Sequence, residues 1–455
     1  MAASHDHIFR AYDIRGIFNK DLDVSIMQKI GIAFGTYMKQ KNGITITLGG
    51  DIRASTNILQ HAFLSGILTT GVNCELVKES PLGITLFNSF NKNYIASAFI
   101  TASHLPPDWN GIKFYWGEGI GFSPEENEEL YQIYKKNLFE QTDVFNLGSY
   151  KIIDPYSDYV SYLKTKFNFQ KNYNIAIDCG NGATSLVVPE LYEELGFNVS
   201  HIFSDPDHNF PNRTSEPTKE SLSQLSTFVK DSNVLFGAGF DGDGDRCVFT
   251  DENGIVISSD IYGLIISEYL IQTQSEKNIL INMECSLSME DYLKSIGANP
   301  SRIKVGHSFL SLEAKNQNAI WGIESSGHAI YPNVFLFDDA LILPLMLVNA
   351  LEYFNLPLSK LIERYPPSIK KRYDLKCDDK YKFQRIKDVI QYLDNKDGYL
   401  NTLDGVALTN DNGRILVRAS NTSPKVRITI EALNQQNYDI IEREYLNDLT
   451  DIIQI

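Results

Sequence analysis

Three stretches of the chain share one pattern: an apolar, strand-like run, then a loop of small residues, then a helical pattern. They begin near Ile44, Asn174 and Asn278, and the first reads ITITLGGDIRASTNILQHAF. In it we expect a strand at residues 44–48 and a helix capped by Ser55. A strand, a loop and a helix in this order form an α/β unit. Three units, roughly 100 residues apart, therefore predict three related α/β domains.

The end of the chain follows a different pattern. The stretch GRILVRASNTSPKVRITIEA has two apolar runs around a polar turn, and residues 426–431 alternate between apolar and polar. Such alternation is typical of strands with one buried face. The predicted fold class is therefore α/β, with mixed sheets in three related domains and a smaller C-terminal α+β domain. The expected domain limits are residues 1–149, 150–254, 255–366 and 367–455.

Length and charge narrow the class of function. With 455 residues and 43% hydrophobic content, the chain is long enough for about three or four globular domains of ~100–150 residues. Its formal net charge of −16 disfavours a protein that coats nucleic acid or anionic lipid, because neutralising phosphates requires surplus Lys and Arg. An anionic substrate would therefore need a local basic pocket.

Cysteine usage and hydropathy indicate the compartment. The five cysteines are scattered and form no C-x-x-C pair, as is typical of a reduced cytosolic protein. The amino terminus lacks the basic flank and apolar core of a signal peptide. The most apolar run, residues 340–348, is too short to span a bilayer and predicts a buried helix. We expect a cytoplasmic monomer or homodimer that binds neither membrane nor nucleic acid.

The stretch FDGDGDR, residues 240–246, places three aspartates at alternate positions. This spacing also opens the calcium loop of an EF-hand, and Glu252 stands at the twelfth position of such a loop. The sixth position, however, is Arg246 instead of the required glycine, and the flanking runs predict strands rather than helices. A structural calcium site is therefore the weaker hypothesis.

Two catalytic hypotheses remain for the same loop. A phosphatase of the haloacid-dehalogenase type would use Asp241 as nucleophile and Asp243 as acid/base. That class has Thr or Val two residues after the second aspartate, where this chain has Asp245. Three carboxylates on one glycine-rich turn fit Mg²⁺ better. Such an ion usually needs a phosphate oxygen to complete its coordination.

A candidate carrier of that phosphate lies in FITASHLPPDWNGIKFYW, residues 99–116. Ser103 is predicted in a loop between an apolar strand and an alternating strand at residues 112–115. An ordinary turn of Ser, Pro, Asp and Asn would explain the loop by itself. A Ser-His-Asp hydrolase is disfavoured because Ser103 and His104 are adjacent, whereas a triad base normally comes from elsewhere in the chain. A serine that carries a phosphoryl group, close to the cation Lys113, suits the loop better.

Four motifs together resemble a known family. TASHLP, FDGDGDR, GIESSGH and RASNTSPKVR occur in the order of the four active-site loops of the α-D-phosphohexomutases, and the chain resembles their bacterial phosphomannomutase/phosphoglucomutase branch. The amino-terminal YDIRG and the stretch HNFPNRTSEP extend the likeness over essentially the whole chain. The resemblance implies three α/β domains and a smaller fourth domain around a central active-site cleft.

The resemblance also implies roles for the reacting groups. Ser103 would be the phosphoserine, and its phosphate would complete a Mg²⁺ site with Asp241, Asp243 and Asp245. Lys113 and His328 would be candidate proton-transfer groups, although a lysine must lose its proton near neutral pH to act as a base. The implied catalytic residues are Ser103, Arg15, Lys113, Arg246 and His328.

A second group of residues would bind the sugar and the phosphate that is not transferred. Glu324 and Ser326 of GIESSGH would read two neighbouring sugar hydroxyls, those on carbons 3 and 4, and His307 would approach the substrate. Lys425 and Arg427 are interpreted as solvated strand charges. The implied phosphate anchor is the turn that contains Arg418, Ser420, Asn421 and Thr422.

The implied reaction interconverts hexose 1-phosphate and hexose 6-phosphate through a hexose 1,6-bisphosphate, which also serves as activator. Mannose and glucose phosphates are the expected substrates, and a phosphoglucosamine mutase is the alternative. Three residues depart from the family pattern: Leu105 stands where Asn is common, Glu284 where lysine is frequent, and Ser325 where the mannose/glucose branch often has Met. Glu284 exchanges a cation for an anion close to the substrate.

Overall fold

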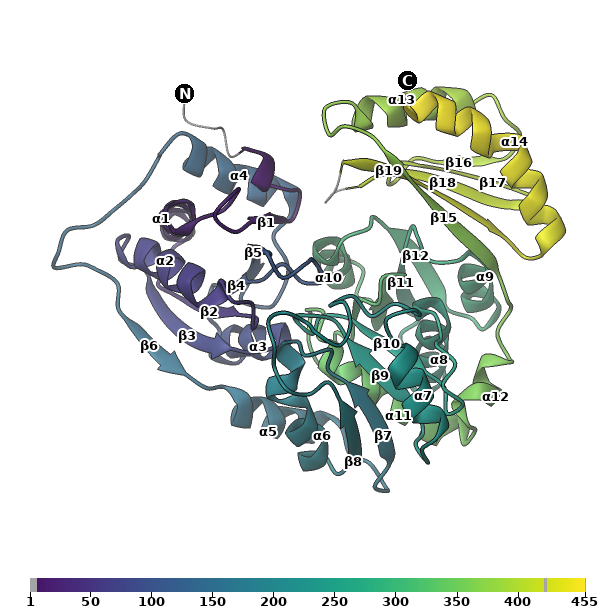
Figure 1. The fold of residues 1–455 in the computed structure, drawn as a ribbon, viewed down its shortest axis with the longest axis horizontal. Coiled ribbons are helices and arrows are strands. Elements are labelled where there is room, and N and C mark those ends of the chain that lie inside the picture. Colours follow the sequence, from purple (N-terminus) through teal and green to yellow (C-terminus); the bar gives the residue numbers. More distant parts are fainter. Residues whose placement is uncertain (1–5, 421–423, 455) are drawn as a thin grey trace.

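The computed structural model describes residues 6–420 and 424–454. These residues form four sheets, each with its own helices, as Figure 1 shows. The predicted fold class is confirmed: three sheets are mixed, and the fourth, at the carboxyl end, is antiparallel throughout.

The first sheet has six strands in the order β1-β5-β4-β2-β3-β6. Its elements are η1 (Asp6–Ile8), β1 (Asp13–Ile17), α1 (Val24–Gln40), β2 (Thr45–Gly50), α2 (Thr56–Leu68), β3 (Asn73–Glu79), α3 (Leu82–Lys92), β4 (Ala96–Ile100), β5 (Trp109–Trp116), α4 (Pro124–Lys135) and β6 (Tyr150–Ile153). Ser55 precedes α2 as predicted, but its side chain makes no capping bond and instead accepts a hydrogen bond from Asn110 Nδ2 at 2.9 Å.

The second and third sheets have four strands each. The second domain contains α5 (Tyr156–Lys166), β7 (Asn174–Asp178), η2 (Ala183–Leu186), α6 (Val188–Glu194), β8 (Asn198–Ile202), α7 (Ser223–Lys230), β9 (Gly237–Phe240) and β10 (Cys247–Thr250). The third contains α8 (Ser259–Thr273), β11 (Asn278–Asn282), α9 (Leu287–Ser295), β12 (Asn299–Ile303), α10 (His307–Asn316), β13 (Trp321–Ile323), β14 (Ala329–Ile330), η3 (Ala340–Ile342), α11 (Leu343–Phe354) and α12 (Leu358–Ile362).

The fourth sheet has the order β15-β19-β18-β17-β16, and α13 and α14 cover one of its sides (Figure 1). Its elements are β15 (Ile369–Lys376), α13 (Lys382–Leu393), β16 (Tyr399–Asn401), β17 (Val406–Asn410), β18 (Gly413–Ala419), β19 (Lys425–Ala432) and α14 (Gln435–Gln454). The two strands predicted around the basic turn are β18 and β19.

The first three sheets repeat one arrangement of four strands. In each, three parallel strands are followed by an antiparallel one, in the orders β3-β2-β4-β5, β8-β7-β9-β10 and β12-β11-β13-β14. The last two strands of each set are joined by a hairpin loop. We call these hairpin loops the serine loop (residues 101–108), the aspartate loop (residues 241–246) and the sugar loop (residues 324–328). They therefore occupy equivalent positions in three related sheets.

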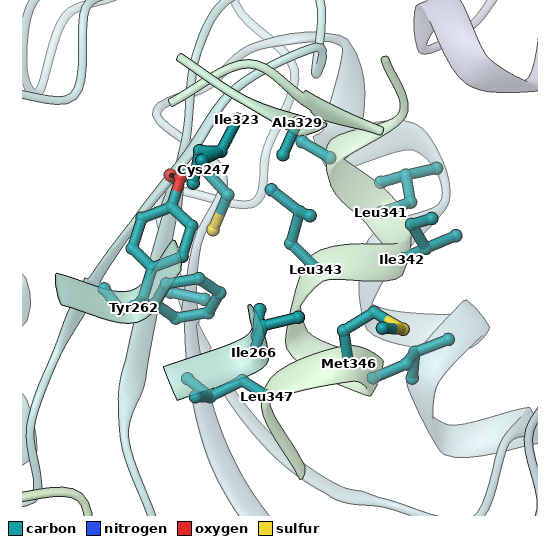
Figure 2. Close-up of a cluster of buried hydrophobic side chains, with 14 of the residues drawn as sticks. Cys247, Tyr262, Ile266, Ile323, Ala329, Leu341, Ile342, Leu343, Met346 and Leu347 are labelled. Atoms are coloured by element: carbon teal, nitrogen blue, oxygen red, sulfur yellow. Dashed lines mark hydrogen bonds between the residues drawn. The ribbon is translucent and has the colours of Figure 1, made fainter. Parts of the chain in front are cut away.

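A continuous apolar core joins the second and third domains. The run predicted as a buried helix forms η3 and the start of α11, and its side chains pack against α8 and the strands β10 and β13, as Figure 2 shows for Leu343, Ile266 and Cys247. Phe87 of α3 and Phe99 of β4 belong to the same core, so the first domain is tied to it as well. Phe240 and Cys247, which flank the aspartate loop, belong to this core.

The domain limits remain a proposal. Strand β6 begins at Tyr150, after the expected first limit, and pairs in parallel with β3 of the first sheet. No helix within residues 6–420 and 424–454 is long and apolar enough to cross a membrane.

Candidate active site

The serine loop and the aspartate loop are in direct contact. Ser103 Oγ donates a hydrogen bond to Asp241 Oδ2 at 3.1 Å, and Thr101 Oγ1 donates to Asp243 Oδ2 at 3.0 Å. A Cβ at Gly242 would lie 2.5 Å from the Ser103 carbonyl oxygen, a distance that real Cβ atoms do not adopt. Gly242 therefore allows the approach of the two loops, and Gly244 supplies a positive φ of 78° for the turn.

Ser103 has an unusual backbone conformation. Its φ is +52°, in the left-handed region that non-glycine residues rarely occupy. The guanidinium of Arg53, itself 1% exposed, holds the loop in this shape while its Nε pairs with Asp51 at 3.0 Å. Arg53 donates to four carbonyls at 2.6–3.0 Å, those of Ser103, Leu105, Pro106 and Trp109. The sequence did not single out Arg53, because its partners lie some fifty positions away.

The aspartate loop offers a set of ligands that fits a hard divalent cation. One oxygen of each of Asp241, Asp243 and Asp245 lies within 4.8 Å of the others, and all three side chains are buried. Oδ1 of Asp243 and Oδ1 of Asp245 have no hydrogen-bond partner among the described residues. Burial and the neighbouring carboxylates of Asp245 and Asp243 raise the pKa of Asp241 well above its usual range. A bound Mg²⁺ would relieve this repulsion and use the unpartnered oxygens.

Lys113 lies against the same carboxylates. Its Nζ is 2.6 Å from Asp245 Oδ2 and 3.0 Å from Asp243 Oδ2, and its side chain is 2% exposed. Burial lowers the pKa of Lys113, but Asp243 and Asp245 outweigh it and raise the pKa well above its usual range. Lys113 is therefore a fixed cation in this arrangement, which disfavours a role as base.

Of the two predicted arginines, Arg246 contacts Ser103, whereas Arg15 lies on a strand next to that of Lys113. Arg246 Nη2 donates to Ser103 Oγ at 3.2 Å, and Arg246 Nε donates to Asp241 Oδ2 at 3.1 Å. Arg15 lies on β1, which pairs with the Lys113 strand β5, and its Nε donates to Asp13 at 2.7 Å. The Nη1 atom of Arg15 has no hydrogen-bond partner within the described part of the chain.

His328 lies at the end of the sugar loop between two carboxylates. Its Nδ1 is 2.7 Å from Asp338 Oδ2 and 3.9 Å from Asp245 Oδ1. Burial lowers the pKa of His328, but Asp245 and the hydrogen bond with Asp338 outweigh it and raise the pKa to about 9. His328 is thus positively charged at neutral pH. Asp338 was missed as a site residue, and its only sequence signal was an acidic pair before the apolar run at residues 340–348.

The remaining sugar-binding candidates lie close to one another. Glu324 Oε1 accepts from the Gly306 amide at 2.7 Å, and Ser326 Oγ donates to Glu324 Oε2 at 3.2 Å. His307 begins α10, and its ring is 6.1 Å from that of His328. Burial lowers the pKa of His307 to about 4, so its ring is neutral, and neither ring nitrogen has a partner among the described residues.

The predicted phosphate anchor is represented by Arg418 and Ser420, since Asn421 and Thr422 lie outside the described residues. Lys382 Nζ donates to the Ser420 carbonyl at 2.6 Å. Arg418 is 3% exposed and pairs with two carboxylates, at 2.8 Å with Asp404 and at 2.6 Å with Glu284. Burial raises the pKa of Glu284, but Arg418 and Arg427 outweigh this and lower it.

Two cations close to the anchor, Lys425 and Arg427, were interpreted from the sequence as solvated strand charges. Lys425 pairs with Asp374 at 2.7 Å, whereas Arg427 is 22% exposed and lies 4.0 Å from Glu284. Arg427 is thus partly buried beside the anchor and is not an ordinary solvated charge.

The calcium hypothesis for the aspartate loop is wrong. The loop joins strands β9 and β10, not two helices. Glu252, the expected twelfth ligand, accepts a hydrogen bond from the Ser359 amide at 3.1 Å instead. The stretch HNFPNRTSEP contacts the strand that leads into the loop, because Arg213 pairs with Asp178 at 3.0 Å and donates to the carbonyl of Phe240, the last residue of β9, at 2.6 Å.

Comparison with known proteins places this geometry in a family. Four consecutive family models match, all described as phosphoglucomutase/phosphomannomutase: alpha/beta/alpha domain I at residues 6–141, domain II at 156–254, domain III at 258–368 and the C-terminal domain at 374–444.

Individual relatives agree with the family models. A probable phosphoglucosamine mutase of Pyrococcus horikoshii is 30% identical, with 98% of each chain covered, and a phosphoglucomutase/phosphomannomutase of Thermococcus kodakarensis is 30% identical over 96% of each. The crystal structure of a phosphoglucomutase/phosphomannomutase family protein from Burkholderia thailandensis superimposes with a TM-score of 0.90 at 26% identity, covering 99% of this chain and 98% of that one. The chain therefore belongs to the phosphoglucomutase/phosphomannomutase family of intramolecular phosphotransferases.

Proposed function

We propose that this enzyme interconverts hexose 1-phosphate and hexose 6-phosphate through a phosphoryl group carried on Ser103. One observation carries the proposal: Ser103 Oγ lies 3.1 Å from Asp241 and 3.2 Å from Arg246 Nη2, at the contact between the serine and aspartate loops. A nucleophilic hydroxyl with cations and metal-binding carboxylates around it is arranged for phosphoryl transfer, which depends on positioning and charge neutralisation.

In the first half-reaction the phosphoryl group leaves Ser103 Oγ for the free hydroxyl oxygen of a hexose 1-phosphate. The Oγ–P bond breaks, a bond forms between phosphorus and O6, and the O6 proton is transferred so that Ser103 regains a hydroxyl. The product is hexose 1,6-bisphosphate. His328, held as a cation by Asp338, would exchange a proton with a substrate oxygen.

In the second half-reaction the bisphosphate has turned around. Its 1-phosphoryl group moves back to Ser103 Oγ, the serine proton is transferred to O1, and hexose 6-phosphate leaves. Arg418 and Ser420, together with Asn421 and Thr422, would hold whichever phosphate is not reacting. Glu324 and Ser326 would bind hydroxyls that occupy similar positions in both orientations.

Mg²⁺, bound by Asp241, Asp243 and Asp245 and by the phosphate on Ser103, would act as a Lewis acid that neutralises the transferring phosphoryl group. Cationic side chains of the protein would neutralise the remaining negative charge of the phosphoryl group. Lys113, Arg246 and Arg15 are each held by a buried ion pair, and Arg246 contacts Ser103 directly, so their positive charge would be in place before the phosphoryl group moves.

Mannose and glucose phosphates are the substrates that the sequence resemblance implies. Glucosamine phosphate is a second candidate, because several relatives at 28–30% identity carry the name phosphoglucosamine mutase. We expect the enzyme to act in the cytoplasm, as a monomer or a homodimer.

Mass spectrometry after incubation with hexose 1,6-bisphosphate and Mg²⁺ tests the carrier. We expect one acid-stable phosphate, located on the peptide that contains Ser103. A labile acyl phosphate on Asp241 would instead support a haloacid-dehalogenase-type phosphatase. Turnover of mannose, glucose and glucosamine 1-phosphates, measured in parallel, identifies the sugar.

A further inference from the structure

Glu284 is held against the arginine of the phosphate anchor. It follows β11, and its Oε1 lies 2.6 Å from Arg418 Nη1. Both backbone groups of Glu284 are hydrogen-bonded: its amide donates to Asn282 Oδ1 at 3.1 Å, and its carbonyl accepts from Lys370 Nζ at 3.0 Å. The carboxylate is therefore a built part of the site and not a mobile surface charge.

The anchor already contains two carboxylates before a ligand binds. Asp404 pairs with Arg418 at 2.8 Å and also accepts from the Val305 amide at 2.9 Å. Glu284 is 14% exposed and has Arg427 at 4.0 Å as its next cation. A substrate phosphate that takes its place on Arg418 competes directly with Glu284, and a buried carboxylate that loses its partner is costly.

A cation on the substrate would compensate that loss. Carbon 2 of a hexose is bonded to carbon 1, so a substituent on carbon 2 lies beside the anchored phosphate when the sugar is bound through its 1-phosphate. An ammonium group there would meet the carboxylate that the phosphate has displaced from Arg418. A hydroxyl at the same position carries no charge and would compensate it only weakly.

We propose that Glu284 is a specificity-determining residue that favours a hexose phosphate with an ammonium group on carbon 2. This inference rests on the proposed function, since it concerns the sugar bound at the same site. It identifies the aminohexose phosphates as the substrate class that the anchor of this chain fits best.

The test is a ratio of two activities. We measure kcat/KM for glucosamine 1-phosphate and for glucose 1-phosphate, with Mg²⁺ and the corresponding 1,6-bisphosphate present, and divide the first by the second. Glu284→Gln, which keeps the shape but removes the charge, should lower this ratio about tenfold. Glu284→Lys should lower it further.

Asp374→Asn is the matched control. It removes one negative charge from the same group of basic residues, where Asp374 pairs with Lys425 and Arg427, but it does not touch Arg418. The ratio in this variant should stay within about twofold of the unsubstituted enzyme.

A second measurement does not depend on the folding of a Glu284 variant. In Ser103→Ala, which retains Glu284 but cannot carry the phosphoryl group, calorimetry should show tighter binding of glucosamine 1-phosphate than of glucose 1-phosphate. Equal affinities, or a Glu284→Gln enzyme in which both sugars change by the same factor, would overturn the inference while leaving the mutase intact. Absence of turnover with every hexose 1-phosphate in the unsubstituted enzyme would overturn the proposed function itself.

Discussion

The first three domains and the fourth are joined in different ways. Apolar side chains such as Phe87, Phe240 and Leu343 form a core that the first three domains share, in addition to a core of the first domain alone. The fourth domain has a separate core, built from its own sheet and from α13 and α14. It meets the third domain through polar contacts, in which Arg414 donates to the Met283 carbonyl at 3.1 Å, and through a small apolar cluster of Met283, Ala407 and Leu416.

This difference separates the parts of the site by their freedom to move. Ser103, Lys113 and the three aspartates are fixed to a shared, close-packed core, which does not deform gradually. Arg418 and Ser420 belong to the domain that has its own separate core, and relative motion is expected between domains whose cores are separate. We infer that the reacting groups stay in place while the phosphate anchor moves when the bisphosphate turns around.

The largest expected effect on activity comes from a substitution in the rigid part of the site, which consists of Ser103, Lys113 and the three aspartates. Asp243→Ala should lower kcat about 10³-fold, because it removes one metal ligand and one partner of Lys113. It should also abolish the rise in thermal stability on adding Mg²⁺, which in the unsubstituted protein should reach about 2.7 kcal/mol at a concentration 100 times Kd. Differential scanning fluorimetry and steady-state kinetics measure the two effects.

Asp231→Ala is the control, because Asp231 is an exposed aspartate at the end of α7 in the same domain. It should leave both quantities unchanged. A full Mg²⁺ response in Asp243→Ala would place the metal elsewhere.

The next largest effect is expected at the interface between the third and fourth domains. Arg414→Met leaves Glu431, which is 2% exposed, without its ion-pair partner at 2.9 Å and should destabilise the fourth domain by about 3–5 kcal/mol. Calorimetry should then resolve an early transition of the fourth domain from a nearly unchanged transition of the first three.

Arg372→Met, at a side chain that is 54% exposed, should shift stability by less than about 0.5 kcal/mol. If Arg414→Met instead produced a single transition shifted as a whole, the four domains would unfold as one unit and the contrast drawn above would be wrong.

The free energy of unfolding should depend on pH through His328, which lies beside Asp245. The raised pKa of His328, about 9 against 6.5 when unfolded, stabilises the metal-free protein fully below pH 6.5. This contribution falls as the pH rises toward 9 and amounts to about 3 kcal/mol at most. Urea unfolding in the presence of a chelator at a series of pH values measures it. His328→Gln should flatten the dependence between pH 6.5 and 9, and an unchanged slope would remove His328 as its source.

The smallest effect is expected at a contact between the first and fourth domains. Arg10 pairs with Asp379 at 3.0 Å, and the two side chains are 19% and 41% exposed. Arg10→Ala should cost less than about 1 kcal/mol of stability. It should still raise the escape of bisphosphate per turnover by about twofold if closure of the fourth domain retains the intermediate. Lys360→Ala, which removes an exposed pair within the third domain, should not change that escape.

The fold was predictable because local patterns determine it. Strand-loop-helix units and alternating apolar residues are visible within short windows, and the aspartates lie within one turn. Arg53 and Asp338 were not predictable in the same way. The partners of Arg53 lie some fifty positions away, and although Asp338 is ten residues from His328, neither residue type signals its partner. The ion pair of Glu284 with Arg418 joins positions 134 residues apart, so the sequence revealed the unusual charge but not the atom it contacts.

The three equivalent hairpin loops have three different proposed roles. In the proposed function one copy carries the nucleophile, one the metal ligands and one the sugar contacts, and each is supported by its own set of parallel strands. A substitution of Glu324 or Ser326 therefore changes a loop that a different sheet supports from those that carry the serine and aspartate loops. Such an enzyme can acquire a new substrate without rebuilding its chemistry, and the sugar loop is the place where a protein engineer should begin.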